Sequence, residues 1–321
     1  MQFRPFRNSD TPLICDLWRQ HSNLRGKYQG LNPSVFERLV LSKTYFDANG
    51  VWLAVDGNQA AGMVHAGFAI ADDQLGLDKQ RGLIVQLLLR GGDDSLAVGV
   101  KLLELAEDYL VKHGASQIEF GGYFPLSPFY LGLYGGSRFV GMLVADQRTG
   151  KVMEAAGYEA FGSVVINHWR LGDFRQVVDR QQMLIGRTYD VQDVSESHPQ
   201  TWLQSCNYDV AAQKMFQLKE RRSGEPVGQV AFWEMEPLAE NWGQNGMGLV
   251  ELSVVPHLRR KGLATYMVGE SLRQLKQAGI GLVEIQHVAT DSVVQALCTK
   301  LDFKPIDSTV LWRKQRPAVS G

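Results

Sequence analysis

The residues best suited to chemistry form one short basic segment in the second half of the chain. Three consecutive cations, at 259–261, follow Pro256 and precede Gly262, Ala264 and an amphipathic sequence. The first turn of a helix carries unpaired N–H groups and a partial positive charge, and small residues let phosphate groups approach the backbone. Cations at that end of a helix cost about 0.3–1 kcal/mol each unless an anion is bound. The segment therefore predicts a site for a phosphate-bearing ligand, and the alternative is a solvated basic turn.

Two nearby side chains have the right types for base chemistry. Glu251 lies on an apolar stretch three residues before Val254, and its carboxylate suits a general base. The alternative for Glu251 is a charged strand residue that faces solvent. His287 ends the apolar stretch 282–288 and is a second candidate base, whose alternative is an exposed histidine at the end of a strand.

These segments belong to the second copy of an internal repeat. A long stretch of the first half aligns with the second half without a gap, at an offset of 165 residues. Each copy reads as strand, loop, amphipathic helix and strand, and each helix ends in a glycine, which is a usual helix stop. The pattern predicts two parallel strands joined by a helix in each half. The matched segments are 84–87 with 249–252, 97–113 with 262–278, Gly114 with Gly279, and 118–120 with 283–285.

The repeat continues on both sides of this part. Residues 146–158 resemble 291–303 at an offset of 145, so the first copy carries about 20 extra residues, roughly 123–144. Upstream, each copy has a predicted β-hairpin with a short turn. A loop at 240–248 is expected to lead from the second hairpin into a strand at 249–255. The expected hairpins are 51–56 with 60–71, and 215–221 with 227–236.

The repeat predicts two similar domains in the 321 residues. We place the first domain at 1–172 and the second at 173–321, because a strand expected at 160–170 ends there and polar sequence begins. The fold class is α/β (α+β), with a mixed, mostly antiparallel sheet flanked by helices in each domain.

With these residues in view, the second half resembles the GNAT superfamily, the acetyl-CoA-dependent N-acetyltransferases. A strand ending in V-x-P, then [RQ]-x-x-G-x-[GA] at the start of a helix, is similar to the coenzyme A pyrophosphate loop of that superfamily. Val254, Pro256, Arg259, Gly262 and Ala264 occupy the motif positions. The resemblance covers most of 180–315, and with the repeat it indicates the tandem two-domain type. It implies a sheet splayed open between its fourth and fifth strands and direct transfer of an acetyl group from acetyl-CoA to a primary amine.

The resemblance also implies roles for individual residues. The backbone from Arg260 to Ala264 would hold the pyrophosphate, with Arg259 beside it, and the strand from Leu252 to Val255 would pair with the pantetheine. The amide of Val254 or Val255 would polarise the thioester carbonyl. The cofactor-binding residues implied in this way are Leu252, Val254, Val255, Arg259, Arg260, Lys261, Gly262, Leu263, Ala264 and Asp291.

The catalytic acid departs from the superfamily pattern. Many members have N-x-x-A-x-x-L-Y in the helix after the fifth strand, where the tyrosine protonates the leaving thiolate. In this chain Asp291 stands at the asparagine position and Cys298 at the tyrosine position. Cys298 is a candidate acid because its reference pKa is about 8.5, and the alternative is a small buried apolar residue. The candidate catalytic residues are therefore Glu251, His287 and Cys298.

The first copy differs at the loop that would hold the pyrophosphate. Asp94 lies over Arg259, Ala97 over Gly262, and Gln86 over Glu251. Aspartates favour a helix N-terminus and repel a pyrophosphate, so we expect Asp93 and Asp94 to cap the helix and the first domain to be a degenerate copy. The insertion at 123–144 has two open interpretations, namely a binding or docking loop and packing against the other domain. Its aromatic and proline residues include Phe124, Pro125, Pro128, Phe129, Tyr130 and Tyr134.

Composition limits the remaining possibilities. Formal net charge is −1, and no second basic cluster accompanies 259–261, which weighs against nucleic-acid binding. Three scattered cysteines and no metal-ligand spacing predict no disulfide framework and no metal. No membrane-spanning or signal segment is recognisable, so we expect a cytoplasmic protein with no membrane partner. The expected co-substrate is acetyl-CoA and the expected acceptor is a small-molecule or peptide amine. The alternative function is a non-catalytic acyl-CoA-binding or protein-interaction module.

Overall fold

The computed structural model of the chain describes residues 1–21, 24–121, 127–138, 141–177, 179–194, 201–207 and 213–315. Contacts between residues divide the chain into two units. The first unit comprises Met1–Val164, Thr201–Cys206 and Ser308–Gly321, and the second comprises Val165–Gln200 and Asn207–Asp307. The domain boundary expected from the sequence, at residue 172, stays a prediction. In the structure the first long segment of the first unit ends at Val164, and the chain returns to the first unit at Ser308.

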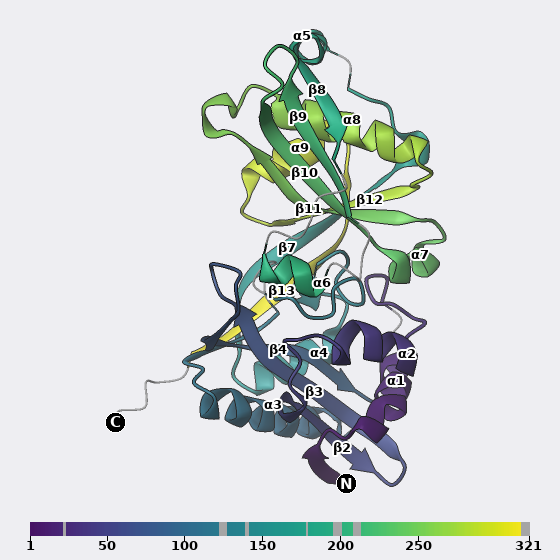
Figure 1. Cartoon of the computed structure of the whole chain (residues 1–321). Helices are drawn as coiled ribbons and strands as arrows, with labels where there is room; N and C mark the ends of the chain where they lie inside the picture. Colours follow the sequence, from purple (N-terminus) through teal and green to yellow (C-terminus); the bar gives the residue numbers. More distant parts are fainter. Residues whose placement is uncertain are drawn as a thin grey trace. The chain divides into compact units, whose positions relative to one another are not determined.

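In the first unit, the strands follow the order β1-β2-β3-β4-β5-β13, and β6 pairs with β13. Figure 1 shows α3 crossing β3 and β4, where its apolar face is buried. The elements are β1 (Gln2–Pro5), α1 (Thr11–Gln20), α2 (Pro33–Phe36), β2 (Val51–Asp56), β3 (Gln59–Ile70), β4 (Leu77–Leu89), α3 (Ser95–Lys112), β5 (Gln117–Phe120), β6 (Met142–Leu143), α4 (Gln147–Ala155) and parts of β7 (Glu159–Arg170), α6 (Trp202–Asn207) and β13 (Lys304–Gln315).

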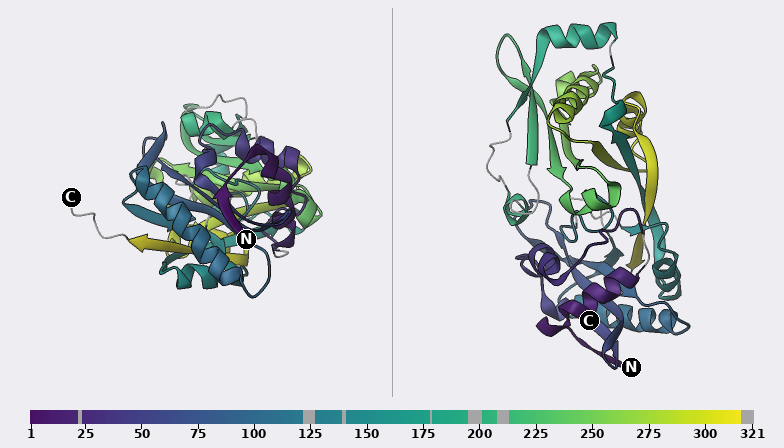
Figure 2. Two further views of the ribbon diagram at one scale, coloured as in Figure 1. Left: turned by 90° about the horizontal axis from the view of Figure 1, so that it is seen from below. Right: turned by 90° about the vertical axis from the view of Figure 1, so that its right-hand side faces the viewer.

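In the second unit, the strands follow the order β7-β12-β11-β10-β9-β8. The right-hand view of Figure 2 shows α8 along one face of β8–β11, and the buried side chains Val230, Phe232, Met267 and Leu272 form part of the core between them. The elements are part of β7, α5 (Arg180–Thr188), β8 (Tyr189–Asp193), β9 (Gln213–Glu220), β10 (Pro226–Glu234), α7 (Glu236–Trp242), β11 (Gly246–Val254), α8 (Leu263–Gln277), β12 (Leu282–Val288), α9 (Ser292–Lys300) and part of β13.

The pairing register confirms the internal repeat. In the first unit β4 pairs with β5 in parallel from Arg81↔Gln117 to Ile84↔Phe120, and in the second β11 pairs with β12 from Gly246↔Leu282 to Leu249↔Ile285. These pairs are related by the offset of 165 seen in the sequence. One residue further on, the antiparallel pairing on the other edge of the same strand shifts register in both units. Val85 is a β-bulge on β4, opposite β3, and Val250 is a β-bulge on β11, opposite β10. Beyond the bulge the strand continues without its parallel partner, so each sheet is splayed at the same place.

The last strand of each repeat contributes to the sheet of the other unit. The C-terminal part of β7 belongs to the second unit, where the Asn167 side chain donates to the Ile285 carbonyl at 3.3 Å. The C-terminal part of β13, yellow in Figure 1, pairs antiparallel with β5 in the first unit, with Trp312 opposite Phe120. The sequence predicted a strand at 160–170 but not this exchange.

Two expectations need correction. The loop expected at 240–248 is shorter than predicted, because α7 extends to Trp242 and β11 begins at Gly246, with Gly243 in the left-handed region (φ 68°) ending the helix. In the insertion, Phe124 and Pro125 lie outside the described residues. Phe129 and Tyr130 are buried within the first unit itself, where Tyr130 stacks on Trp18 with ring centroids 6.0 Å apart. The described part of the insertion therefore packs on its own unit.

No helix among the described residues is both long and apolar enough to span a membrane.

Candidate functional site

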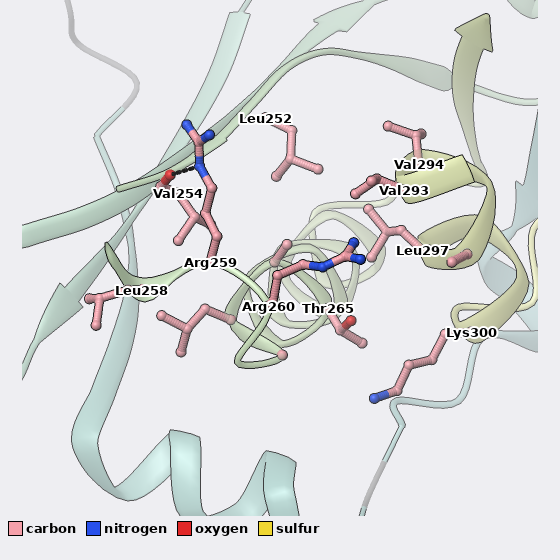
Figure 3. Close-up of a pocket in the computed structure, with 14 residues that line it drawn as sticks. Leu252, Val254, Leu258, Arg259, Arg260, Thr265, Val293, Val294, Leu297 and Lys300 are labelled. Carbon is pink, nitrogen blue, oxygen red and sulfur yellow. Dashed lines mark hydrogen bonds between the residues drawn. The ribbon is translucent and has the colours of Figure 1, made fainter. Parts of the chain in front are cut away.

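A cleft of about 650 Å³ lies in the second unit, between the end of β11, the start of α8 and one face of α9. Figure 3 shows side chains from all three elements pointing into it. The lining is apolar along β11 and α9 and basic at the loop between β11 and α8. The residues that line the cleft are Leu252, Val254, Leu258, Arg259, Arg260, Gly262, Leu263, Ala264, Thr265, Val293, Val294, Ala296, Leu297 and Lys300.

The loop at one end of the cleft has a backbone that only small or strained residues adopt. Arg260 (φ 64°) and Gly262 (φ 81°) both lie in the left-handed region, which costs a non-glycine residue about 1–2 kcal/mol. A Cβ atom at Gly262 would also come within 3.0 Å of the Gln181 side chain, whose amide donates to the Lys261 carbonyl at 3.1 Å. This geometry explains why a glycine stands directly before α8.

The start of α8 is open to a ligand. Gly262 is its N-cap residue, and no side chain among the described residues caps it. The first N–H groups of a helix have no partner within the helix, so the amides of Leu263, Ala264 and Thr265 point out of its end. All three residues line the cleft. The exposed side chains of Arg260 and Lys300 line the same cleft, so the site carries positive charge from backbone and side chains together.

Arg259 has a different part from its neighbour. Its Nε donates to the Val254 carbonyl at 2.8 Å, which fixes the loop to the end of β11 (Figure 3). Lys261 is exposed, but its side chain does not line the cleft. Of the three consecutive cations, Arg260 is the one whose head group remains directed across the cleft towards α9 in Figure 3.

The edge of β11 beside the cleft is suited to strand-like pairing. The Val255 amide donates to the Val227 carbonyl of β10 at 2.9 Å. N–H directions alternate along a strand, so the amides of Val254 and Leu252 point away from β10. They point to the edge of β11 that pairs with β12 only as far as Leu249. The sequence left either Val254 or Val255 as the amide that contacts a carbonyl oxygen. The structure corrects this, since Val255 is already bonded to β10.

Glu251 lies at the point where β11 and β12 separate. Its side chain alternates with Leu252 and so lies on the other face of the sheet from the apolar cleft lining. It is half-buried, and the Gln229 side chain of β10 donates a hydrogen bond to its Oε1. One carboxylate oxygen is therefore held by a hydrogen bond. Glu251 is not the charged strand residue facing solvent that the sequence offered as the alternative to a general base.

The other two candidate catalytic residues are buried away from the cleft. His287 is 3% exposed, and its Nδ1 lies 2.9 Å from the Val288 carbonyl, so it is not the exposed strand-end residue that was its alternative. Cys298 is also 3% exposed, and burial, with a smaller contribution from Asp291, raises the pKa of its thiol to about 12. A thiol with that pKa is a poor acid, which disfavours the role of Cys298 as proton donor.

Asp291 also needs correction as a ligand-binding residue. Its carboxylate accepts hydrogen bonds from the amides of Val293 and Val294, each at 3.0 Å, and it caps α9 without lining the cleft. The sequence missed the contribution of α9 and of two residues near the loop. Helical spacing of small and apolar residues after Asp291 was the available signal. The missed lining residues are Leu258, Thr265, Val293, Val294, Ala296, Leu297 and Lys300.

The equivalent loop of the first unit has lost these features. Asp93 and Asp94 are exposed, and Asp94 is the N-cap residue of α3, but its side chain makes no capping hydrogen bond. The expected cap is therefore wrong in detail, although two negative charges remain next to the helix start.

Within the part of the chain that the structure describes, no group of three or more His, Cys, Asp or Glu side chains is placed to hold a metal ion.

Comparison with known proteins agrees with this geometry. Residues 186–303 match the family model described as the acetyltransferase (GNAT) family. The chain is similar to a GCN5-related N-acetyltransferase from Sphaerobacter thermophilus, with a TM-score of 0.66 and 15% identity over 99% of this chain and 96% of that chain. It is also similar to a tandem GNAT protein from the clavulanic acid biosynthesis pathway, with a TM-score of 0.64 and 13% identity over 99% of both chains.

A third similar structure is a GCN5-related glucosamine N-acetyltransferase region of a fungal multi-domain GH3 β-N-acetylglucosaminidase. The TM-score is 0.71 and the identity 14%, over 98% of this chain and 38% of that chain. At these identities the solved structures show a shared fold. The comparison with proteins of curated function found no match.

Proposed function

We propose that this chain, whose residues 186–303 form a domain of the acetyltransferase (GNAT) family within a tandem GNAT fold, transfers an acetyl group from acetyl-CoA to a primary amine. One observation carries the proposal: the uncapped N-terminus of α8 and the unpaired edge of β11 meet in a single cleft with Arg260 and Lys300. A diphosphate joined to an extended, amide-containing chain is complementary to that combination.

The residues of the second unit account for binding of both parts of such a ligand. The amides of Leu263, Ala264 and Thr265 would donate hydrogen bonds to the pyrophosphate, with Arg260 and Lys300 neutralising its charge. The pantetheine amides would pair with Leu252 and Val254, and the apolar face of α9 would cover the opposite side. The Val254 amide would then be the group nearest the thioester carbonyl.

The reaction follows from these positions. The amine nitrogen attacks the thioester carbon, and the Val254 amide stabilises the negative charge on oxygen in the tetrahedral intermediate. Glu251 accepts the proton that the amine must lose, directly or through water, with its carboxylate oriented by Gln229. The C–S bond then breaks and the electron pair leaves on sulfur. A free thiol has a pKa of about 8.5, so coenzyme A leaves as thiolate without an acid in the protein, consistent with the buried Cys298.

We propose a small-molecule or peptide amine as the acceptor, with no part for nucleic acid or membrane. The three cysteines are free thiols, which supports a reducing compartment and hence the cytoplasm as the place of action.

The test combines calorimetric titration of acetyl-CoA with measurement of coenzyme A release in the presence of a panel of amines. Binding of acetyl-CoA with release that depends on an amine supports the enzyme. Binding of acetyl-CoA without release of coenzyme A with any amine supports the alternative, a non-catalytic acyl-CoA-binding module. The observation that favours this alternative is the lack of an accessible acid at Cys298. Absence of any binding heat rules out both.

A further inference from the structure

The first unit has the same splayed strand as the second, and its equivalent edge is already occupied. Leu89 at the end of β4 corresponds to Val254 at the end of β11 through the offset of 165. The next amide behaves identically in both units: the Arg90 amide donates to Ala61, and the Val255 amide to Val227, each at 2.9 Å. The Leu89 amide therefore points to the splayed side, as that of Val254 does.

A histidine of the same unit binds the Leu89 amide. His21 follows α1, and its Nδ1 lies 3.3 Å from both the nitrogen and the carbonyl oxygen of Leu89. Its Nε2 lies 2.8 Å from Asp146, so Nε2–H donates to that carboxylate. Both side chains are sealed from solvent, at 0% and 2% exposed. Burial opposes the charge of Asp146, but hydrogen bonds from His21 and Thr149 outweigh burial and hold the pKa of this carboxyl below its ordinary value.

An arginine binds the carbonyl of the same residue, Leu89. Arg148 on α4 donates from Nη1 to the Leu89 carbonyl at 2.8 Å, and its guanidinium lies over Gly91, at 3.2 Å from where a Cβ atom would be. Through the offset of 145, Arg148 corresponds to Val293 of α9. Val293 is 56% exposed and lines the open cleft of the second unit.

We propose that His21, Asp146 and Arg148 form an internal plug that occupies the place in the first unit equivalent to the cleft of the second unit. The plug uses the N–H and C=O groups of Leu89, and the N–H group is the equivalent of the Val254 N–H that acetyl-CoA would contact in the second unit. The Val254 carbonyl is already bonded to Arg259, so His21 gives the Leu89 amide the contact that the Val254 amide gains when acetyl-CoA binds. The part of this inference that concerns acetyl-CoA rests on the proposed function, and the part that concerns the plug does not.

Backbone hydrogen exchange of the whole protein, followed residue by residue by NMR, tests both parts. We expect the Leu89 amide to exchange slowly with and without acetyl-CoA. We expect the Val254 amide to exchange at least tenfold faster than Leu89 without ligand and to slow at least tenfold with saturating acetyl-CoA. A Leu89 amide that exchanges as fast as that of Val254, or that slows on addition of acetyl-CoA, overturns the plug. A protected Leu89 with no response at Val254 supports the plug and counts against the proposed function.

Variants separate the plug from general rigidity of the first unit. His21→Ala combined with Arg148→Val, which places the residue of the second unit on α4, is expected to raise the exchange rate at Leu89 at least tenfold and to leave Val254 unchanged. Lys151→Ala, an exposed change on the same helix, is the control and is expected to alter neither amide. If the double variant loses protection throughout β3, the single half-buried change Arg148→Val replaces it. Unchanged exchange at Leu89 in the folded variants overturns the proposal.

Discussion

Gly262 and its counterpart Ala97 test which copy of the repeat binds acetyl-CoA. Gly262→Asp combines a left-handed backbone (φ 81°), a contact with Gln181 and a negative charge at the phosphate site. We expect acetyl-CoA affinity to fall at least 100-fold, because backbone strain of about 1–2 kcal/mol adds to charge repulsion. Ala97→Asp, an exposed change at the same position of the first unit, is the control and should leave affinity within twofold. Calorimetry gives both constants, and equal losses would contradict the assignment to the second unit.

Glu251 and Gln229 test the proton-transfer step. Glu251→Gln keeps the size of the side chain and removes the base, so we expect kcat to fall by about 10²–10⁴-fold while acetyl-CoA affinity stays within threefold. Gln229→Leu removes the hydrogen bond that holds the carboxylate, and we expect a smaller fall in kcat together with a changed pH profile. Steady-state kinetics with the best amine of the panel give these values. An unchanged kcat in Glu251→Gln would leave the general base elsewhere.

Sequence reasoning located the loop at the end of the cleft because its residues are consecutive. The contact of Arg260, Gly262 and Ala264 with one cleft follows from local spacing, and the repeat supplied a comparison at each position. The part played by α9 needed the tertiary fold, since Val293 and Lys300 are far from the loop in sequence and have ordinary helical spacing. The hydrogen bond from the Val255 amide to Val227 could not be predicted from the sequence either, because it depends on which edge of β11 pairs with β10.

At the scale of elements, His65 on β3 makes the first unit sensitive to acid. Burial lowers the pKa of His65 to about 3, and in the unfolded chain the value is about 6.5. Between these values the unfolded chain binds one proton more, so the contribution of His65 to stability is complete above about pH 6.5 and is lost as the pH falls. The slope is about 1.4 kcal/mol per pH unit, or about 2 kcal/mol between pH 6.5 and pH 5.

Urea unfolding curves at those two pH values, for the natural chain and for His65→Gln, measure this effect. The other titrating groups are common to both proteins, so the readout is the difference between them. We expect the natural chain to lose about 2 kcal/mol more than the variant on going from pH 6.5 to pH 5. Equal losses would show that His65 titrates normally in the folded protein.

The elements themselves were largely predictable and their partners were not. The helix expected at 262–278 is α8 at Leu263–Gln277, and the strand expected at 282–288 is β12 at the same residues. Periodicity fixes such elements locally. The loop expected at 240–248 was placed too wide because its glycines and asparagines suggest a loop throughout, whereas α7, with its fully buried Leu238, extends to Trp242 and β11 begins at Gly246. Packing overrode composition there.

At the scale of the whole molecule, the exchanged strand links the end of the chain to the stability of its beginning. In the first unit, the C-terminal part of β13 pairs with β5 from Trp312↔Phe120 to Gln315↔Gln117. Its Arg313 donates to Glu119 at 2.6 Å, and Glu119 is only 4% exposed. Removal of β13 therefore uncovers a sheet edge and leaves a buried carboxylate without its cationic partner, which costs several kcal/mol.

Deletion of residues 308–321 is the change that isolates this effect. We expect the amides of β5 and β4 to exchange at least 100-fold faster and the first unit to unfold at lower temperature. The reason is that the deleted part of β13, although it comes from the second repeat in sequence, pairs with β5 of the first unit. The cleft lining between Leu252 and Lys300 remains in the chain, so acetyl-CoA affinity should fall less than tenfold. Deletion of 316–321 alone keeps every described strand and is the matched control. Loss of acetyl-CoA binding with full protection of β5 would show that β13 serves the second unit instead.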